Sequence, residues 1–274
     1  MLHRAIWRSP DAAAVPFRTI YWIDLVPFTI PDLSRLAILL DVDGTLLDIA
    51  PTPREVRVPD GLSRLLLDLA QRCDGALALV SGRPISELDV IFDPLRLPAV
   101  GGHGAEIRFS ADGAVMAGRV PPLDPVFKQR LEDVAGEFPG VLVEDKGYGV
   151  ALHFRLALER GPAIVHAVRQ LFRVWADSSL ELLSGKAVLE VKFAGFNKGT
   201  GVRELMRRSP FAGRTPLFIG DDRTDEDAFS VMPDFKGVAI SVGRSLPGVD
   251  HTLGSPAEVR AWLEGLLRLA AAES

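Results

Sequence analysis

The sequence of 274 residues contains a single cysteine, Cys73, and no long hydrophobic run. One cysteine excludes an intramolecular disulfide and a metal site built from several thiolates, and it is typical of a reducing compartment. Because a helix needs about 18 successive apolar residues to cross a bilayer, we expect no membrane partner. The first residues also lack the uninterrupted apolar segment of a signal peptide. We therefore expect a cytoplasmic protein.

The sequence also lacks a large net charge of either sign. The 31 lysine and arginine residues are outnumbered by 36 aspartate and glutamate residues, which gives a net charge of −5. This balance lacks the positive field that nonspecific nucleic-acid binding requires, and the four tryptophans are scattered along the chain. We expect no nucleic-acid partner. A small anionic substrate remains compatible, because a few well-placed cations can bind it locally.

What the sequence does contain is the composition of a globular protein, with 47% hydrophobic residues and a length that suggests about two domains. Short apolar runs typical of strands buried on both faces lie at 36–40, 76–80, 216–220 and 237–242. Helical patterns lie between and after them, at 60–71 and 255–271. This alternation predicts an α/β fold with a doubly wound, mostly parallel sheet.

The middle of the chain has a different pattern. Partial alternation predicts strands at 114–120, 141–145, 148–156 and 186–193, with helices at 124–137 and 161–176. The order β-α-β-β-α-β is typical of an α+β layer with a mostly antiparallel sheet. We therefore predict an N-terminal extension (1–34), a core (35–111 and 194–274) and an inserted domain (112–193).

Three of the apolar runs end directly in reactive polar residues. Asp41 and Asp43 follow the first run, Ser81 follows the second, and Asp221 follows the third. The carboxyl ends of parallel strands meet at one edge of a sheet, where ligands bind. Converging carboxylates repel one another unless a cation lies among them, and magnesium prefers oxygen ligands. Taken alone, Asp41 and Asp43 are equally well explained as turn residues, and the acids from Asp221 to Asp227 as a helix N-terminus capped by Thr224.

The segment Asp41-Val-Asp-Gly-Thr-Leu46 resembles the DxDGT(L/V) signature of the haloacid-dehalogenase-like (HAD) phosphatases. Ser81, Lys198 and Asp221 are similar to the second, third and fourth motifs of that superfamily, in the same order, and the resemblance covers about residues 36–270. Further segments resemble trehalose-6-phosphate phosphatases: 81–84, 102–106, 144–146, 153–155, 185–190 and 220–227. One departure is Phe193 and Phe196, which stand where a Lys-Pro-x-Gly pattern is expected in part.

The resemblance implies a Rossmann-like core, a cap domain and a mechanism. Asp41 would be the nucleophile that forms an aspartyl-phosphate, and Asp43 would be the general acid and base. Ser81 and Lys198 would bind the phosphoryl group. The cofactor Mg2+ would be held by Asp41, the main-chain carbonyl of Asp43 and Asp221. Asp222 and Asp225 would orient its water ligands.

The resemblance also implies a set of substrate contacts. On the core these are Asp41, Val42, Asp43, Ser81, Gly82 and Arg83, and on the cap Glu144, Lys146, Arg155, Lys186 and Glu190. Each charged cap residue alone is equally typical of a surface ion pair. His103 lies between glycines, where it either lines the cleft or serves as a turn residue, and His153 fits a structural role better than a catalytic one.

The expected function is magnesium-dependent hydrolysis of trehalose 6-phosphate to trehalose and phosphate by a monomer. Three alternatives stay open: a phosphatase for another sugar phosphate, such as sucrose or mannosylglycerate phosphate, a phosphomutase, and an inactive phosphosugar sensor. The presence of Asp41, Asp43, Ser81, Lys198 and Asp221 argues against the sensor.

Overall fold

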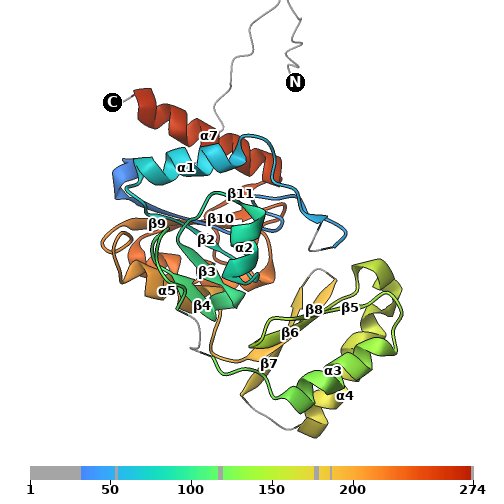
Figure 1. Ribbon diagram of the computed structural model, residues 1–274. Coiled ribbons are helices and arrows are strands. Elements are labelled where there is room, and N and C mark those ends of the chain that lie inside the picture. Colours follow the sequence, from blue (N-terminus) through green and yellow to red (C-terminus); the bar gives the residue numbers. More distant parts are fainter. Residues whose placement is uncertain (1–31, 53–54, 117–119, 176–178, 186, 273–274) are drawn as a thin grey trace, which may run out of the picture.

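The computed structural model describes residues 32–52, 55–116, 120–175, 179–185 and 187–272. Within these ranges the chain forms two β-sheets, each with its own hydrophobic core (Figure 1). No helix in the described ranges combines the length and the apolar character needed to cross a membrane.

The larger sheet has the strand order β11-β10-β9-β1-β2-β3-β4. Its strands are β1 (Leu36–Leu40), β2 (Leu77–Val80), β3 (Ala99–Gly101), β4 (Glu106–Arg108), β9 (Thr215–Gly220), β10 (Val238–Val242) and β11 (His251–Leu253). All neighbours pair in parallel except β3 and β4. Every side chain of β1 is buried, as expected for an all-apolar strand at the centre of a parallel sheet.

Helices cover both faces of this sheet, and they confirm the doubly wound α/β fold. They are α1 (Leu62–Arg72), α2 (Ile85–Ile91), α5 (Lys198–Met206), α6 (Glu226–Phe229) and α7 (Pro256–Ala272). In Figure 1, α1 and α7 lie side by side above the sheet and α5 lies below it. Cys73 follows α1 and is fully buried, and burial raises the pKa of its thiol to about 12, so the thiol stays protonated.

The smaller sheet is antiparallel, with the strand order β5-β6-β8-β7. Its elements are α3 (Pro125–Gly136), β5 (Leu142–Asp145), β6 (Gly149–His153), α4 (Gly161–Trp175), β7 (Leu180–Gly185) and β8 (Val188–Phe193). Side chains alternate between the faces of a strand, so Leu152 and Leu189 pack with the helices around Phe127. Glu144, Ala151 and Glu190 pair across the sheet on its other face, which is turned toward the larger sheet (Figure 1).

The predicted β-α-β-β-α-β order of this region is wrong, because the observed order is α3-β5-β6-α4-β7-β8. Of the expected strand at 114–120, Met116 forms only a single bridge, to Ile107 of β4, and residues 117–119 lie outside the described ranges. The sequence pattern does not predict β7, because its residues Leu180–Gly185 are half-buried or exposed and the alternation of polarity breaks at Leu182 and Leu183. Among the described residues, this strand lies at the edge of the sheet and pairs with β8.

We propose that the smaller sheet and its two helices form the inserted domain, called the cap below, with boundaries near residues 112 and 193. In the same proposal, residues 35–111 and 194–274 form the core. Of the expected extension 1–34, residues 1–31 lie outside the described part of the chain, and Leu33–Arg35 form a short 3-10 turn, η2, before β1.

Candidate active site

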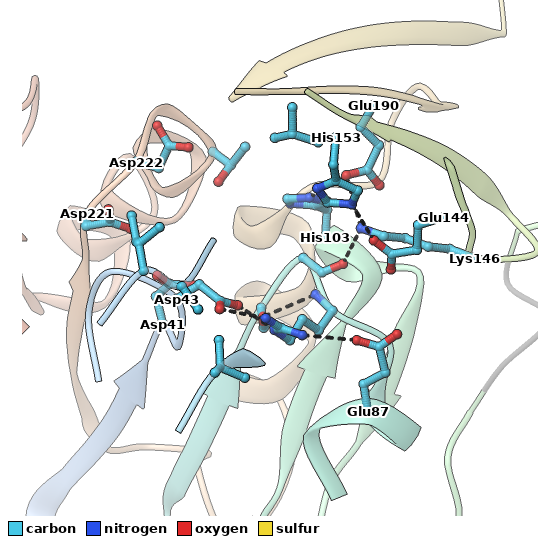
Figure 2. Close-up of a pocket in the computed structure, with 18 of the residues that line it drawn as sticks. Asp41, Asp43, Glu87, His103, Glu144, Lys146, His153, Glu190, Asp221 and Asp222 are labelled. Carbon is cyan, nitrogen blue, oxygen red and sulfur yellow. Dashed lines mark hydrogen bonds and ion pairs between the residues drawn. The ribbon is translucent and has the colours of Figure 1, made fainter. Parts of the chain in front are cut away.

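The central feature of the site is the meeting of three strand ends. Asp41 follows β1, Ser81 follows β2 and Asp221 follows β9, and β1 lies between β9 and β2 in the sheet. All three side chains are almost fully buried and line one pocket, with a cavity volume of about 170 Å³ (Figure 2). Strand order alone therefore brings together residues that are up to 180 positions apart.

Lys198 neutralises part of the charge in this pocket. It is the first residue of α5, and its Nζ donates to Oδ1 of Asp41 and Oδ1 of Asp225, each at 2.6 Å. Burial disfavours the charged ammonium, but Asp225 and Asp41 outweigh burial and raise the pKa of Lys198 above its usual range. Burial and the neighbouring Asp225 raise the pKa of Asp41 to about 7, despite the opposing effect of Lys198. Lys198 alone therefore does not compensate the carboxylates around it.

A group of three buried carboxylates, from Asp41, Asp221 and Asp225, has the chemistry of a divalent-cation site. One oxygen from each residue lies within 4.8 Å of the others. Gly44 makes the approach possible: its φ is +85°, and a Cβ there would lie 2.3 Å from Oδ2 of Asp221. Oxygen ligands of this kind suit magnesium. Asp225 also accepts from the N–H groups of Asp221 and Asp222, each at 2.9 Å, so it organises the loop after β9.

The side chain of Asp43 points away from this group and pairs with Arg83. Arg83 donates through Nε and Nη2 to the two carboxylate oxygens, at 2.6 and 2.8 Å, and through Nη1 to Glu87 at 3.2 Å. The backbone N–H of Arg83 donates to Oγ of Ser81 at 3.1 Å. Two planar donors on one carboxylate fix its orientation. Asp43 is partly exposed and lines the pocket.

The cap contributes the opposite wall. Four cap residues expected to contact substrate line the same pocket: Glu144, Lys146, Arg155 and Glu190 (Figure 2). Lys146 Nζ donates to the carbonyl of Gly82 in the core at 2.8 Å and to Glu190 Oε2 at 3.2 Å. Arg155 donates to the carbonyl of Ala50 in the core. The fifth expected residue, Lys186, lies outside the described residues.

Other expected residues lie behind the pocket or at its edge. Val42 does not line it, because its side chain is buried in the hydrophobic core and its carbonyl accepts the N–H groups of Leu46 and Leu47. Asp225 is buried beneath the pocket, and Asp222 lies on its rim.

Several pocket residues were missed by the sequence analysis or left undecided. Those missed outright include Ile49, Ala50, Thr52, Val56, Glu87, Val188 and Thr224. Glu87 had a usable signal, because it follows Arg83 by one helical turn. His153 pairs with Glu144, with Nε2 and Oε2 2.7 Å apart. Its side chain lies on the same face of β6 as that of Ala151. His103 lies inside the pocket, 3.1 Å from Glu190.

Comparison with known proteins agrees with this geometry. The trehalose-phosphatase family model matches residues 39–255. Trehalose-6-phosphate phosphatase of Escherichia coli (strain K12) is 37% identical over 238 residues, which cover 85% of this chain and 88% of that protein. A crystal structure of a trehalose-6-phosphate phosphatase related protein is 28% identical with a TM-score of 0.70, over 87% of this chain and 100% of that one.

The fold is shared more widely. A haloacid dehalogenase-like hydrolase from B. subtilis superposes with a TM-score of 0.56 over 85% of this chain and 99% of that one, at 16% identity, a likeness that concerns the fold alone. The chain therefore belongs to the trehalose-phosphatase family of phosphoric monoester hydrolases and has the HAD fold.

Proposed function

We propose that this protein hydrolyses trehalose 6-phosphate to trehalose and inorganic phosphate, and that it uses an aspartyl-phosphate intermediate and Mg2+. The observation that carries the proposal is the placement of a charged cap face, with Glu144, Lys146 and Glu190, across one pocket from Asp41. A phosphate bound at Asp41 would leave its sugar facing the cap. The names of the relatives support the choice of sugar.

Asp41 is the nucleophile of this mechanism. Thr45 Oγ1 donates to its Oδ2 at 3.0 Å and Lys198 to its Oδ1 at 2.6 Å, so the carboxylate is held in one orientation. A carboxylate oxygen attacks phosphorus, a new P–O bond forms, and the bond from phosphorus to the sugar oxygen breaks. This divides one difficult displacement into two easier ones. Lys198 and Ser81 lie where they would bind phosphate oxygens.

Asp43 moves the proton in both steps. It donates a proton to the departing sugar oxygen, and in the second step it accepts a proton from the water that attacks the aspartyl-phosphate. Phosphate is released and the carboxylate of Asp41 is restored. In this structure both oxygens of Asp43 accept from Arg83, so one of them would have to leave Arg83 to carry the proton to a sugar oxygen at the mouth of the pocket.

The carboxylates of Asp41 and Asp221, together with the main-chain carbonyl of Asp43, would hold Mg2+. Asp222 and Asp225 would support this group from behind, since Asp225 fixes the loop that carries Asp221 and Asp222. When bound, the ion would offset the repulsion between carboxylate and phosphate. The three crowded carboxylates and the raised pKa of Asp41 are the features of this chain that fit such a cation.

The cap would read the sugar. Glu144, Lys146, Arg155 and Glu190 offer donors and acceptors that would pair with glucose hydroxyls beside their present protein partners, and the wrong sugar would make fewer of these contacts. We expect Lys186 to belong to the same set.

The products of the reaction test this proposal. The purified chain is incubated with trehalose 6-phosphate and Mg2+, and free phosphate and trehalose are measured together. Equal amounts of both are expected. A phosphorylated isomer without free phosphate would indicate a phosphomutase, and unchanged substrate would indicate a sensor or a phosphatase for another sugar phosphate; each of these results contradicts the proposal.

A further inference from the structure

His103 lies in a turn that is attached to the phosphate-binding loop. The turn η4 (Gly102–Gly104) follows β3, and its N–H groups donate to the loop after β2: Gly102 to the carbonyl of Arg83 at 2.9 Å and His103 to the carbonyl of Ser81 at 3.1 Å. His103 has a φ of +53°, a left-handed conformation that strains a residue with a side chain. Strain of this kind persists only where the surroundings hold it in place, and it clusters at functional sites.

The surroundings of His103 are packed too tightly for the turn to relax. A Cβ on Gly102 would lie 1.9 Å from Oη of Tyr148, and one on Gly104 would lie 2.4 Å from the carbonyl oxygen of Asn197. A Cβ on Gly82 would lie 2.4 Å from Nε2 of His103, so the imidazole rests directly against the backbone of the phosphate-binding loop. Both flanking positions therefore require glycine, yet the strained residue between them is a histidine.

The ring of His103 contacts a carboxylate of the cap. Its Nε2 lies 3.1 Å from Oε2 of Glu190, and Lys146 Nζ lies 3.2 Å from the same oxygen. Burial opposes the charge of Glu190, but Lys146 and His103 hold the pKa of that carboxyl below its usual range, so it is ionised. Burial lowers the pKa of His103, which favours the neutral ring. An ionised carboxylate only accepts hydrogen bonds, so Nε2 of His103 is the donor.

These contacts form a single chain from core to cap: His103 to Glu190, Glu190 to Lys146, and Lys146 back to the carbonyl of Gly82. We propose that His103 is a positioning residue for sugar recognition, which docks Glu190 and Lys146 onto the phosphate-binding loop so that the cap closes in one register. The proposal rests on the proposed function, since it concerns the same pocket. Figure 2 shows His103 between the cap carboxylates and the core.

Two amide substitutions separate positioning from folding. His103→Asn suits the left-handed backbone but is too short to reach Glu190, whereas His103→Gln places an N–H near the position of Nε2. Loss of a hydrogen bond to a charged group predicts that His103→Asn lowers kcat/KM for trehalose 6-phosphate about tenfold or more, mainly through KM. Hydrolysis of p-nitrophenyl phosphate, which lacks a sugar for the cap to bind, should change less than about twofold, and His103→Gln should restore most of the loss.

The matched control is His166→Asn, because His166 is exposed on α4. It should leave both activities unchanged. If His103→Asn lowered kcat/KM equally for both substrates, His103 would act in the fold or in the phosphate chemistry. If KM for trehalose 6-phosphate were unchanged, His103 would have no role in binding the sugar. Either result overturns the proposal.

A second measurement needs no substrate. His103→Asn, Glu190→Gln and the double variant are unfolded in urea, and the shifts of the midpoint are compared. Because the two residues are in direct contact, the midpoint of the double variant should fall by clearly less than the sum of the two single shifts. Additive shifts would overturn the contact. If the wild-type protein fails to hydrolyse trehalose 6-phosphate, the proposed function fails, while this comparison still decides whether His103 docks onto Glu190 of the cap.

Discussion

Nζ of Lys198 lies 2.6 Å from Oδ1 of Asp41, although 157 residues separate the two in the sequence. All helices and strands of the cap lie between these two residues in the sequence, so the pair joins the two segments of the core that flank the cap. Both side chains are almost fully buried. A buried ion pair of this kind contributes little net stability, and it is costly to break.

Asp41→Asn should abolish phosphate release and leave the fold intact. Asparagine cannot form the acyl phosphate, so we expect a loss of at least about a thousandfold. The raised pKa of Asp41 shows that the fold disfavours its charge, and Lys198 keeps Asp225 as a partner, so a neutral amide is tolerated. Phosphate release and a thermal melt test this. Retained activity, with the variant folded, would falsify the nucleophile assignment.

Lys198→Met should destabilise the protein strongly. The substitution leaves Asp41 and Asp225 buried without their cation, a loss of about 3–5 kcal/mol in the free energy of unfolding. Urea unfolding without added magnesium measures it. Lys236→Met is the control, because Lys236 is exposed, and it should change stability by less than about 0.5 kcal/mol. Equal effects of the two substitutions would contradict the account.

Magnesium should stabilise the folded protein through Asp221. A ligand that binds only the folded state at about 100 times its Kd adds about 2.7 kcal/mol, which raises the melting temperature. Asp221→Asn should lose most of this rise, whereas Asp133→Asn, an exposed residue of α3, should keep it. A chelator should stop phosphate release. If magnesium did not change the melting temperature of the wild-type protein, this result would contradict the proposed cation site.

Glu190 should make stability depend on pH. Lys146 and His103, working against burial, hold its pKa below the usual value of 4.5. A carboxyl whose folded-state pKa is depressed adds stability above its unfolded pKa, and this stability is lost as the pH falls toward the folded-state value. The wild type should therefore exceed Glu190→Gln in free energy of unfolding at about pH 7, by a margin that shrinks below about pH 4.5. If urea unfolding gave a difference in free energy between the two proteins that did not change with pH, the charge of Glu190 would not contribute to stability.

The strand-end residues could be predicted from the sequence because their signal is local. An all-apolar run that ends in Asp41, and another that ends in Ser81, predicts both the strand and the place of the polar residue after it. Parallel pairing with β1 at the centre then brings the ends together. The antiparallel cap sheet was expected for the same reason. The predicted order of helices and strands along this part of the chain was wrong, and β7 was not predicted, because its half-buried edge residues show no clear period.

The partners of these residues could not be predicted, because they depend on tertiary contacts. Arg83 follows Ser81 closely, but its carboxylate partner Asp43 lies 40 positions away, and the contact between His103 and Glu190 spans 87 positions. Asp225 shows the same limit. The resemblance implies only that it orients the water ligands of the metal, and the structure shows in addition that it receives Lys198 and two backbone N–H groups.

The most direct test of the central claim is the ratio of kcat/KM for trehalose 6-phosphate to that for glucose 6-phosphate, measured as phosphate release with magnesium present. Both substrates carry the same phosphate, and only the disaccharide offers a second glucose to the polar face of the cap. Buried polar groups left unpaired by the wrong substrate support discrimination of at least about a hundredfold, which is the result we predict. Equal values for the two substrates would contradict the account.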